Sequence, residues 1–179
     1  VIEDAKSAAK FKLVTNYRST KQIIKFANEI LKPFTRKYLP KSIDRVGEEP
    51  LVEIFHSSTE MTQKFIENFS KEVKKVEKSI GVIVFESPDF RFNDVKKEIN
   101  EIEINGIKNN FIELNSKQKT TYIPNGEYFM KADDCKGLEF SEVYVLNLNL
   151  KKIKTFSKAK EAFVAVTRAM NELCIYGVK

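Results

Sequence analysis

The segment "GVIVFES" at residues 81–87 is a nearly continuous apolar run, and it constrains the fold more than any other stretch of the chain. A strand that faces solvent on one side alternates apolar and polar residues, whereas a strand buried on both faces is apolar throughout. Strands of the second kind belong to parallel sheets that carry helices on both sides. The segment therefore predicts a buried strand of a parallel sheet.

Helix-like and strand-like segments alternate along the rest of the chain. Apolar residues at helical spacing predict four helices, at residues 21–34, 59–78, 92–100 and 157–170. Further strands are expected at residues 11–15, 51–57, 110–114, 126–132, 142–148 and 172–178. Such alternation predicts one α/β domain with a mostly parallel central sheet flanked by helices. In sheets of this kind, ligands gather at the carboxyl ends of the strands.

The composition excludes several classes of function. A net charge of +6 permits a polyanionic partner but does not establish one. The two cysteines, Cys135 and Cys174, lack metal-ligand spacing and His56 is the only histidine, so we expect no metal site. No apolar run reaches the length of a membrane span and no signal peptide is visible, so we expect a cytoplasmic protein without a membrane partner.

Three charged motifs stand at the ends of the predicted elements: "NYRST" at 16–20, "DDCKGLEF" at 133–140 and "FVAVTRAM" at 163–170. Each has an ordinary explanation when it is taken alone. Ser19 and Gln22 have capping-box spacing at a helix start. A plain surface turn accounts for the second motif, and a favourable interaction with the helix dipole accounts for Arg168.

Taken together and in this order, the three motifs resemble motifs IV, V and VI of UvrD/Rep/PcrA-type superfamily 1 helicases. The matching runs are "NYRSTKQIIKFANEIL", "KGLEF" followed by an apolar strand, and "FVAVTRAM", and they span residues 13–176. All three motifs belong to the second RecA-like domain of the helicase motor. The resemblance implies that residues 1–179 form a single C-terminal RecA-like, P-loop NTPase-like domain, and that an N-terminal P-loop domain precedes Val1 in a longer protein.

The resemblance also implies roles for five residues. Arg18 and Arg168 match the two arginines that contact the γ-phosphate of ATP, and a guanidinium suits this role because it stays charged and binds two phosphate oxygens. Tyr17 matches the aromatic residue that stacks on adenine. Glu139 matches the acidic residue that accepts hydrogen bonds from the ribose hydroxyls, and Gly137 leaves room for that approach. The implied cofactor is ATP with Mg²⁺, and the missing N-terminal domain would hold the Mg²⁺.

The residues that contact the nucleic-acid strand match less well. Motif V usually carries threonine and histidine five and three positions before its lysine, where this chain has Lys131 and Asp133. Lys131 and Lys136 are the candidate nucleic-acid contacts, whereas Asp133 would repel a phosphate. The implied partners are single-stranded nucleic acid, with DNA as the first candidate, and the N-terminal RecA-like domain of the same protein.

The chain is too short between its motifs for a complete UvrD-type domain. Only 115 residues separate Thr20 from Lys136, which leaves no space for the large helical subdomain that UvrD-type enzymes insert. This compactness and the run "RVGEEP" at 45–50 resemble the HelD-type branch or other short superfamily 1 relatives. HelD-type proteins engage RNA polymerase, so the resemblance implies RNA polymerase as a further partner.

The expected function is that of the C-terminal motor domain of an ATP-dependent DNA helicase or translocase. It would complete the ATP site with arginines and couple hydrolysis to movement on single-stranded nucleic acid. The chain contains no G-x-x-x-x-G-K-[ST] loop, so we expect no ATP hydrolysis by the chain alone. The alternative is a non-catalytic, helicase-derived module that docks on nucleic acid or on a protein such as RNA polymerase.

Overall fold

The centre of the molecule is a six-stranded sheet in which every pair of neighbouring strands is parallel. The computed structural model describes residues 15–37, 39–72, 77–101, 103–104, 107–108, 111–115 and 123–179. The strand order is β3-β10-β9-β4-β8-β7. The bounds are β3 Leu51–Phe55, β4 Ser79–Val84, β7 Ile112–Glu113, β8 Gly126–Lys131, β9 Phe140–Leu146 and β10 Ala169–Val178. The predicted α/β class with a parallel sheet is confirmed.

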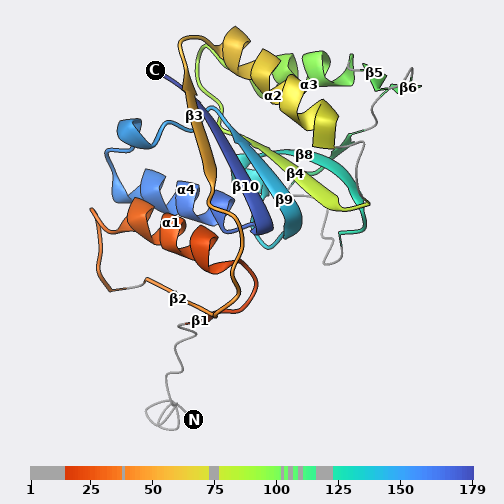
Figure 1. The fold of residues 1–179 in the computed structure, drawn as a ribbon. Helices are drawn as coiled ribbons and strands as arrows, with labels where there is room; N and C mark the ends of the chain where they lie inside the picture. The colour runs from red at the N-terminus through yellow and green to blue at the C-terminus, as the bar shows by residue number, and fades with distance from the viewer. Residues whose placement is uncertain are drawn as a thin grey trace, which may run out of the picture.

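Helices cover both faces of this sheet (Figure 1). One face carries α1 (Lys21–Leu31) and α4 (Phe156–Val166), and the opposite face carries α2 (Ser58–Glu72) and α3 (Phe92–Asn100). All four helices were predicted. The helix expected at 157–170 ends at Val166, because β10 begins at Ala169 and takes the last residues into the sheet.

The inner strands are buried on both sides. In β4, Ile83 packs with the α1 and α4 side chains, whereas Val82 and Val84 pack with those of α2 and α3. All three side chains are at most 1% exposed. Successive residues of a strand point to opposite faces, so a strand covered twice needs apolar residues at every position. This explains the unbroken apolar run at 81–87.

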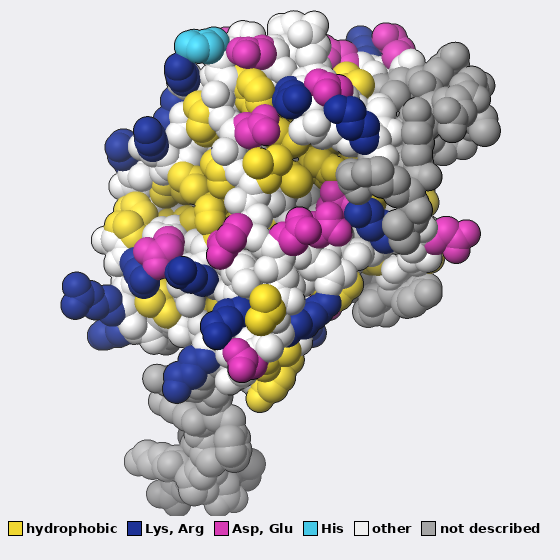
Figure 2. All heavy atoms as spheres, in the orientation of Figure 1, with side chains coloured by type: hydrophobic (Ala, Val, Ile, Leu, Met, Phe, Trp, Pro, Cys, Tyr) yellow, Lys and Arg dark blue, Asp and Glu magenta, His cyan; other side chains and the backbone are white. Residues whose placement is uncertain are grey.

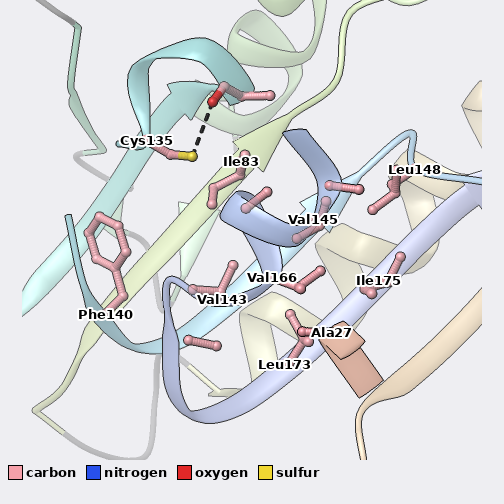
Figure 3. Close-up of a cluster of buried hydrophobic side chains, with 14 of the residues drawn as sticks. Ala27, Ile83, Cys135, Phe140, Val143, Val145, Leu148, Val166, Leu173 and Ile175 are labelled. Carbon is pink, nitrogen blue, oxygen red and sulfur yellow. Dashed lines mark hydrogen bonds between the residues drawn. The ribbon is translucent and has the colours of Figure 1, made fainter. Parts of the chain in front are cut away.

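Helix α4 lies against the sheet through small side chains. Its buried residues are Ala159, Ala162, Ala165 and Val166. Figure 3 shows the core on this side, where Val166 lies among side chains of β9 and β10 that include Val143 and Leu173. A helix with an alanine face approaches its neighbours closely and presents few protruding groups to them.

Short elements complete the described chain. The two-residue strands β1 (Thr15–Asn16) and β2 (Lys41–Ser42) pair with each other in parallel, and β5 (Glu103–Ile104) pairs with β6 (Ile107–Lys108). The 3₁₀ turns η2 and η3 span Ala132–Asp134 and Leu150–Lys152. Of the strand expected at 11–15, Thr15 lies in β1, outside the central sheet, and residues 11–14 lie outside the described residues.

The predicted capping box at the start of α1 is wrong. The N-cap residue is Thr20, and its side chain makes no capping hydrogen bond. The Ser19 hydroxyl is buried without a hydrogen-bond partner among the described residues. The Gln22 side chain accepts a hydrogen bond from the backbone N–H of Gly47, at 2.9 Å, instead of reaching back to the helix start. Tertiary contacts therefore replace the local cap.

Cys135 belongs to the core on the α1 and α4 side. Its side chain is 0% exposed, and its Sγ donates a hydrogen bond to the carbonyl oxygen of Ala132 at 3.0 Å (Figure 3). Burial raises the pKa of the Cys135 thiol to about 11 from its ordinary value of 9.0. A thiol that keeps its proton in this way is a poor nucleophile, so Cys135 has a structural role.

We expect Cys135 to make the fold lose stability at alkaline pH. The stabilising difference is fully present below pH 9 and is lost as the pH rises toward 11, because the unfolded thiol ionises before the folded one. Cys135→Ala should flatten the decline of the unfolding free energy between pH 9 and 11 by about 2–3 kcal/mol at most. Urea unfolding of both proteins measures this. Unfolding at pH 7 is the control, since the thiol is neutral there in both states, and an unchanged alkaline slope would contradict the prediction.

Candidate functional site

Two of the predicted motifs meet at the amino edge of the central sheet. β9 begins one residue after Glu139, and β10 begins one residue after Arg168. The backbone N–H of Phe140 donates a hydrogen bond to the carbonyl oxygen of Arg168, at 3.0 Å. Because β9 and β10 are parallel neighbours, the residues that precede them lie side by side. Strand pairing therefore joins "KGLEF" to "VTRAM".

Arg18 joins this edge from the turn before α1. Its Nη1 atom lies 2.5 Å from Oε1 of Glu139, and the two side chains are 66% and 28% exposed. The Oδ1 atom of Asn16 accepts hydrogen bonds from the backbone N–H groups of Arg18 and Ser19, at 2.8 and 2.9 Å. An asparagine that caps its own turn in this way fixes the backbone of the following residues. The Arg18 guanidinium thus faces solvent, with Glu139 as its counter-charge.

The guanidinium of Arg168 is turned toward the protein. Its Nε donates to the carbonyl oxygen of Val164 and its Nη1 to that of Leu138, both at 3.0 Å. Its Nη2 donates to Oγ1 of Thr167 at 3.4 Å. These bonds use three of the five N–H groups of the guanidinium. Arg168 therefore ties the end of α4 to the loop that precedes β9.

The three charged side chains share one electrostatic environment. Burial is the main cause that lowers the pKa of Arg168, and the charge of Arg18 acts in the same direction, whereas the charge of Glu139 opposes it. An arginine remains protonated under all ordinary conditions. Arg18, Glu139 and Arg168 thus form one group of interacting charges at the amino edge.

Tyr17 and Gly137 flank these charges. The Tyr17 side chain is 69% exposed, so its ring is open to a flat ligand. Gly137 has φ +81°, a left-handed conformation that favours glycine, and no atom lies within 4 Å of the position where a Cβ would stand. The backbone conformation explains the glycine, and the open space beside it accords with the predicted approach of a ligand.

The motif residues do not lie at the carboxyl ends of the central strands, where ligands of such sheets gather. The second and third motifs precede their strands instead of following them. "NYRST" does follow a strand, but that strand is β1, which pairs only with β2 among the described residues. A position after β1 therefore says nothing about the edges of the central sheet.

The two predicted nucleic-acid contacts, Lys131 and Lys136, lie in different parts of the structure. Lys131 ends β8 at the carboxyl edge, where its Nζ lies 2.9 Å from Oε2 of Glu86 and 5.5 Å from the ring centroid of Phe92. The hydrogen bond with Glu86 raises the pKa of Lys131. Lys136 is exposed and lines a hollow of about 350 Å³ between η2 and α4. Lys131 thus lies at the edge opposite to Arg18 and Arg168, and Lys136 faces the hollow beside α4.

A cluster of lysines at the carboxyl edge was not singled out in the sequence. Residues 150–160 contain five lysines and no acidic residue, and all five are exposed. We call these five and the exposed Lys179 the basic edge: Lys151, Lys152, Lys154, Lys158, Lys160 and Lys179. Dark blue side chains border the left side of Figure 2, where Figure 1 shows the segment between β9 and α4. Five lysines within eleven residues, with no acidic residue among them, are the signal that sequence reasoning missed.

The basic edge adjoins a hollow of about 520 Å³. Lys152, Lys158 and Lys179 line it together with Ser57 and Ser58 at the start of α2. Phe156 is 41% exposed beside the hollow's lysines, with Nζ of Lys160 5.1 Å from its ring centroid. Cations and an exposed aromatic ring together suit a single-stranded polyanion.

Within the described ranges, no group of three or more His, Cys, Asp or Glu side chains is placed to hold a metal ion. No helix in those ranges is long and apolar enough to cross a membrane.

A solved structure shares this fold. The chain is similar to the crystal structure of the C-terminal domain of a possible DNA helicase from Lactobacillus plantarum WCFS1, with a TM-score of 0.66 and 20% identity over 92% of this chain and 88% of that chain. The likeness confirms the predicted RecA-like fold. No protein-family profile matches the sequence, and no curated protein matches it.

We expect the backbone at Gly137 to tolerate asparagine better than the smaller alanine. Its left-handed φ should make Gly137→Ala lower the unfolding free energy by about 1–2 kcal/mol, since a Cβ is disfavoured there. Gly137→Asn should lose less, because asparagine tolerates this conformation and the space is open. Urea unfolding of the three proteins gives the order. Equal losses for alanine and asparagine would contradict the backbone explanation.

Proposed function

We propose that this chain is the second RecA-like domain of an ATP-driven motor that moves along single-stranded nucleic acid, with DNA as the first candidate. Its amino edge would complete the ATP site of a preceding P-loop domain. The observation that carries the proposal is the convergence of Arg18, Glu139 and Arg168 from three separate segments at the amino ends of β9 and β10. The resemblance of the motifs to superfamily 1 helicases supports it.

The Arg18–Glu139 pair has the properties of an exchangeable contact. Both side chains reach solvent, so a nucleotide can approach them without unfolding the domain. When a phosphate binds Arg18, one charge-assisted hydrogen bond replaces another, and the guanidinium is never left without an anion. Glu139 is then free to accept hydrogen bonds from ribose hydroxyls. Tyr17, exposed beside Arg18, would stack on the base.

Arg168 has the properties of a preorganised cation. Three hydrogen bonds hold its guanidinium in place, so little side-chain entropy remains to be lost when a phosphate arrives. Its acceptors are carbonyl and hydroxyl oxygens, which orient the group without neutralising its charge. A fixed positive charge of this kind stabilises the negative charge that develops on a transferred phosphoryl group.

The cofactor in this proposal is ATP with Mg²⁺, which supplies the energy of phosphoryl transfer. The exposed guanidinium, the open space at Gly137 and the exposed Tyr17 ring fit a nucleotide. The preceding domain would hold the Mg²⁺ and the attacking water. This chain would bind and orient the nucleotide and shield its developing charge.

We place the nucleic-acid strand at the basic edge. Exposed lysines neutralise backbone phosphates and release counterions, and the exposed Phe156 ring offers a stacking surface. Lys131 pairs with Glu86 and Lys158 pairs with Glu161, so a phosphate that binds either lysine would replace a carboxylate. Lys136 lies between the two edges, near Lys160.

A second candidate function is a docking module without motor activity, which binds nucleic acid or a protein such as RNA polymerase. One observation favours it: the cations of the amino edge already have partners within the chain, since Arg18 contacts Glu139 and Arg168 contacts backbone carbonyls. A cation with internal partners can serve stability alone. ATPase measurements separate the two functions.

We expect Arg18→Ala and Arg168→Ala each to lower the ATPase kcat of the full-length gene product on the order of a hundredfold, with nucleotide binding largely kept, since each removes a cation that acts in the transition state. Steady-state kinetics with and without single-stranded DNA measures this. Arg36→Ala, at an exposed arginine beyond the other end of α1, is the matched control. Unchanged turnover in both variants, or no ATPase in the wild type, would favour the docking module.

We also expect the double variant Lys152→Ala/Lys158→Ala to bind single-stranded DNA more weakly. Loss of two phosphate contacts should reduce the slope of log K against log salt by about 1.4. Fluorescence anisotropy with a labelled oligonucleotide across a salt series gives the slope. Lys64→Ala/Lys71→Ala on α2 removes the same net charge elsewhere and should leave it unchanged. An equal effect of both double variants would show that net charge alone governs binding.

A further inference from the structure

The "RVGEEP" run, which the proposed function leaves without a role, docks on the start of α1. The carbonyl oxygen of Arg45 accepts a hydrogen bond from the backbone N–H of Lys21 at 2.8 Å, and the N–H of Gly47 donates to Oε1 of Gln22 at 2.9 Å. A Cβ at Gly47 would stand 2.4 Å from Cγ2 of Thr20, so the close approach requires glycine. The segment supplies the partners that a local cap would otherwise provide.

The Arg45 side chain extends from this segment across the amino edge. Its Nη1 donates to the carbonyl oxygen of Arg18 at 2.5 Å, and its Nη2 donates to Oδ1 of Asn171 in β10. The Asn171 amide nitrogen in turn donates to Oγ of Ser141 in β9, at 2.9 Å. One guanidinium thus links the turn before α1 to both strands of the site.

These contacts reach each segment that carries a charged residue of the proposed ATP site. Arg45 holds the backbone of Arg18 itself. Asn171 lies three residues after Arg168, and Ser141 lies two residues after Glu139. Because both Nη atoms bind protein groups, the Arg45 side chain holds these segments in position relative to one another.

We propose that Arg45 is a positioning residue, which holds Arg18 in register with the amino ends of β9 and β10 so that Arg18 and Arg168 act on the same phosphate. This inference rests on the proposed ATP site. Arg45 is exposed, so its hydrogen bonds contribute little to the stability of the fold. Their effect on the position of Arg18 is larger, since a displacement of about 1 Å at a catalytic group can lower the rate on the order of a hundredfold.

A double-mutant cycle in the full-length gene product tests the inference. We expect Arg45→Ala to lower kcat about tenfold or more with little change in KM for ATP, because the ground-state contacts remain. In the Arg18→Ala background, Arg45→Ala should cause no further loss, since Arg45 acts through Arg18. A merely structural role would lower activity by the same factor in both backgrounds.

Two further variants keep the test decisive. Arg45→Lys retains one cationic donor and should recover part of the lost kcat, and Asn171→Ala removes the other end of the link and should show the same dependence on Arg18. Thermal unfolding of each variant verifies that the fold is intact, and either of these two replaces Arg45→Ala if that variant does not fold. Arg36→Ala again controls for the loss of an exposed arginine.

The outcomes separate the two levels of the proposal. If Arg18→Ala lowers turnover and Arg45→Ala leaves it unchanged, or if their effects multiply, the role of Arg45 is overturned while the ATP site stands. If Arg18→Ala alone has no effect, the role of Arg45 is overturned. If the wild type has no ATPase, or if neither Arg18→Ala nor Arg168→Ala changes it, the proposed function fails and the inference fails with it.

Discussion

The parallel direction of all six central strands is the constraint on which the rest of the structure depends. Each strand ends at the carboxyl edge, so each connection must return across a face of the sheet before the next strand can begin. The strand starts are thereby collected at one edge and the strand ends at the other. The chain gives these edges different chemistry: arginines with a glutamate at the strand starts, and a cluster of exposed lysines at the strand ends.

The two arginines of the proposed ATP site are held at the amino edge in different ways. Arg168 is oriented by the carbonyl oxygens of Val164 and Leu138, which are neutral dipoles. Removing the Arg168 charge from water costs desolvation free energy that a surface arginine does not lose. The hydrogen bonds compensate this cost. Arg18, by contrast, forms an ion pair with the carboxylate of Glu139. Arg168 is thus oriented by neutral groups, whereas Arg18 has Glu139 as its counter-charge.

Much of the fold could be predicted from residue patterns, because burial on two faces leaves a visible trace such as the apolar run at 81–87. The end of α4 could not, since helical spacing continues past Val166 and only strand pairing withdraws the last residues. The meeting of Arg18, Glu139 and Arg168 was expected only through the resemblance of their motifs. The contacts of Arg45 depend on residues distant in sequence, and no local pattern reports them. The lysines at 150–160 stand in the sequence, but the edge of the sheet on which they lie could not be predicted from it.

Helix α4 connects the two edges directly. Lys158 lies in its first turn at the basic edge, and Arg168 follows its last turn at the opposite edge. Eleven helical residues make a stiff rod about 16 Å long. Its buried face consists mostly of alanines, so the helix lies close to the sheet. A stiff helix transmits a displacement of one end to the other, so α4 links the two edges of the sheet mechanically.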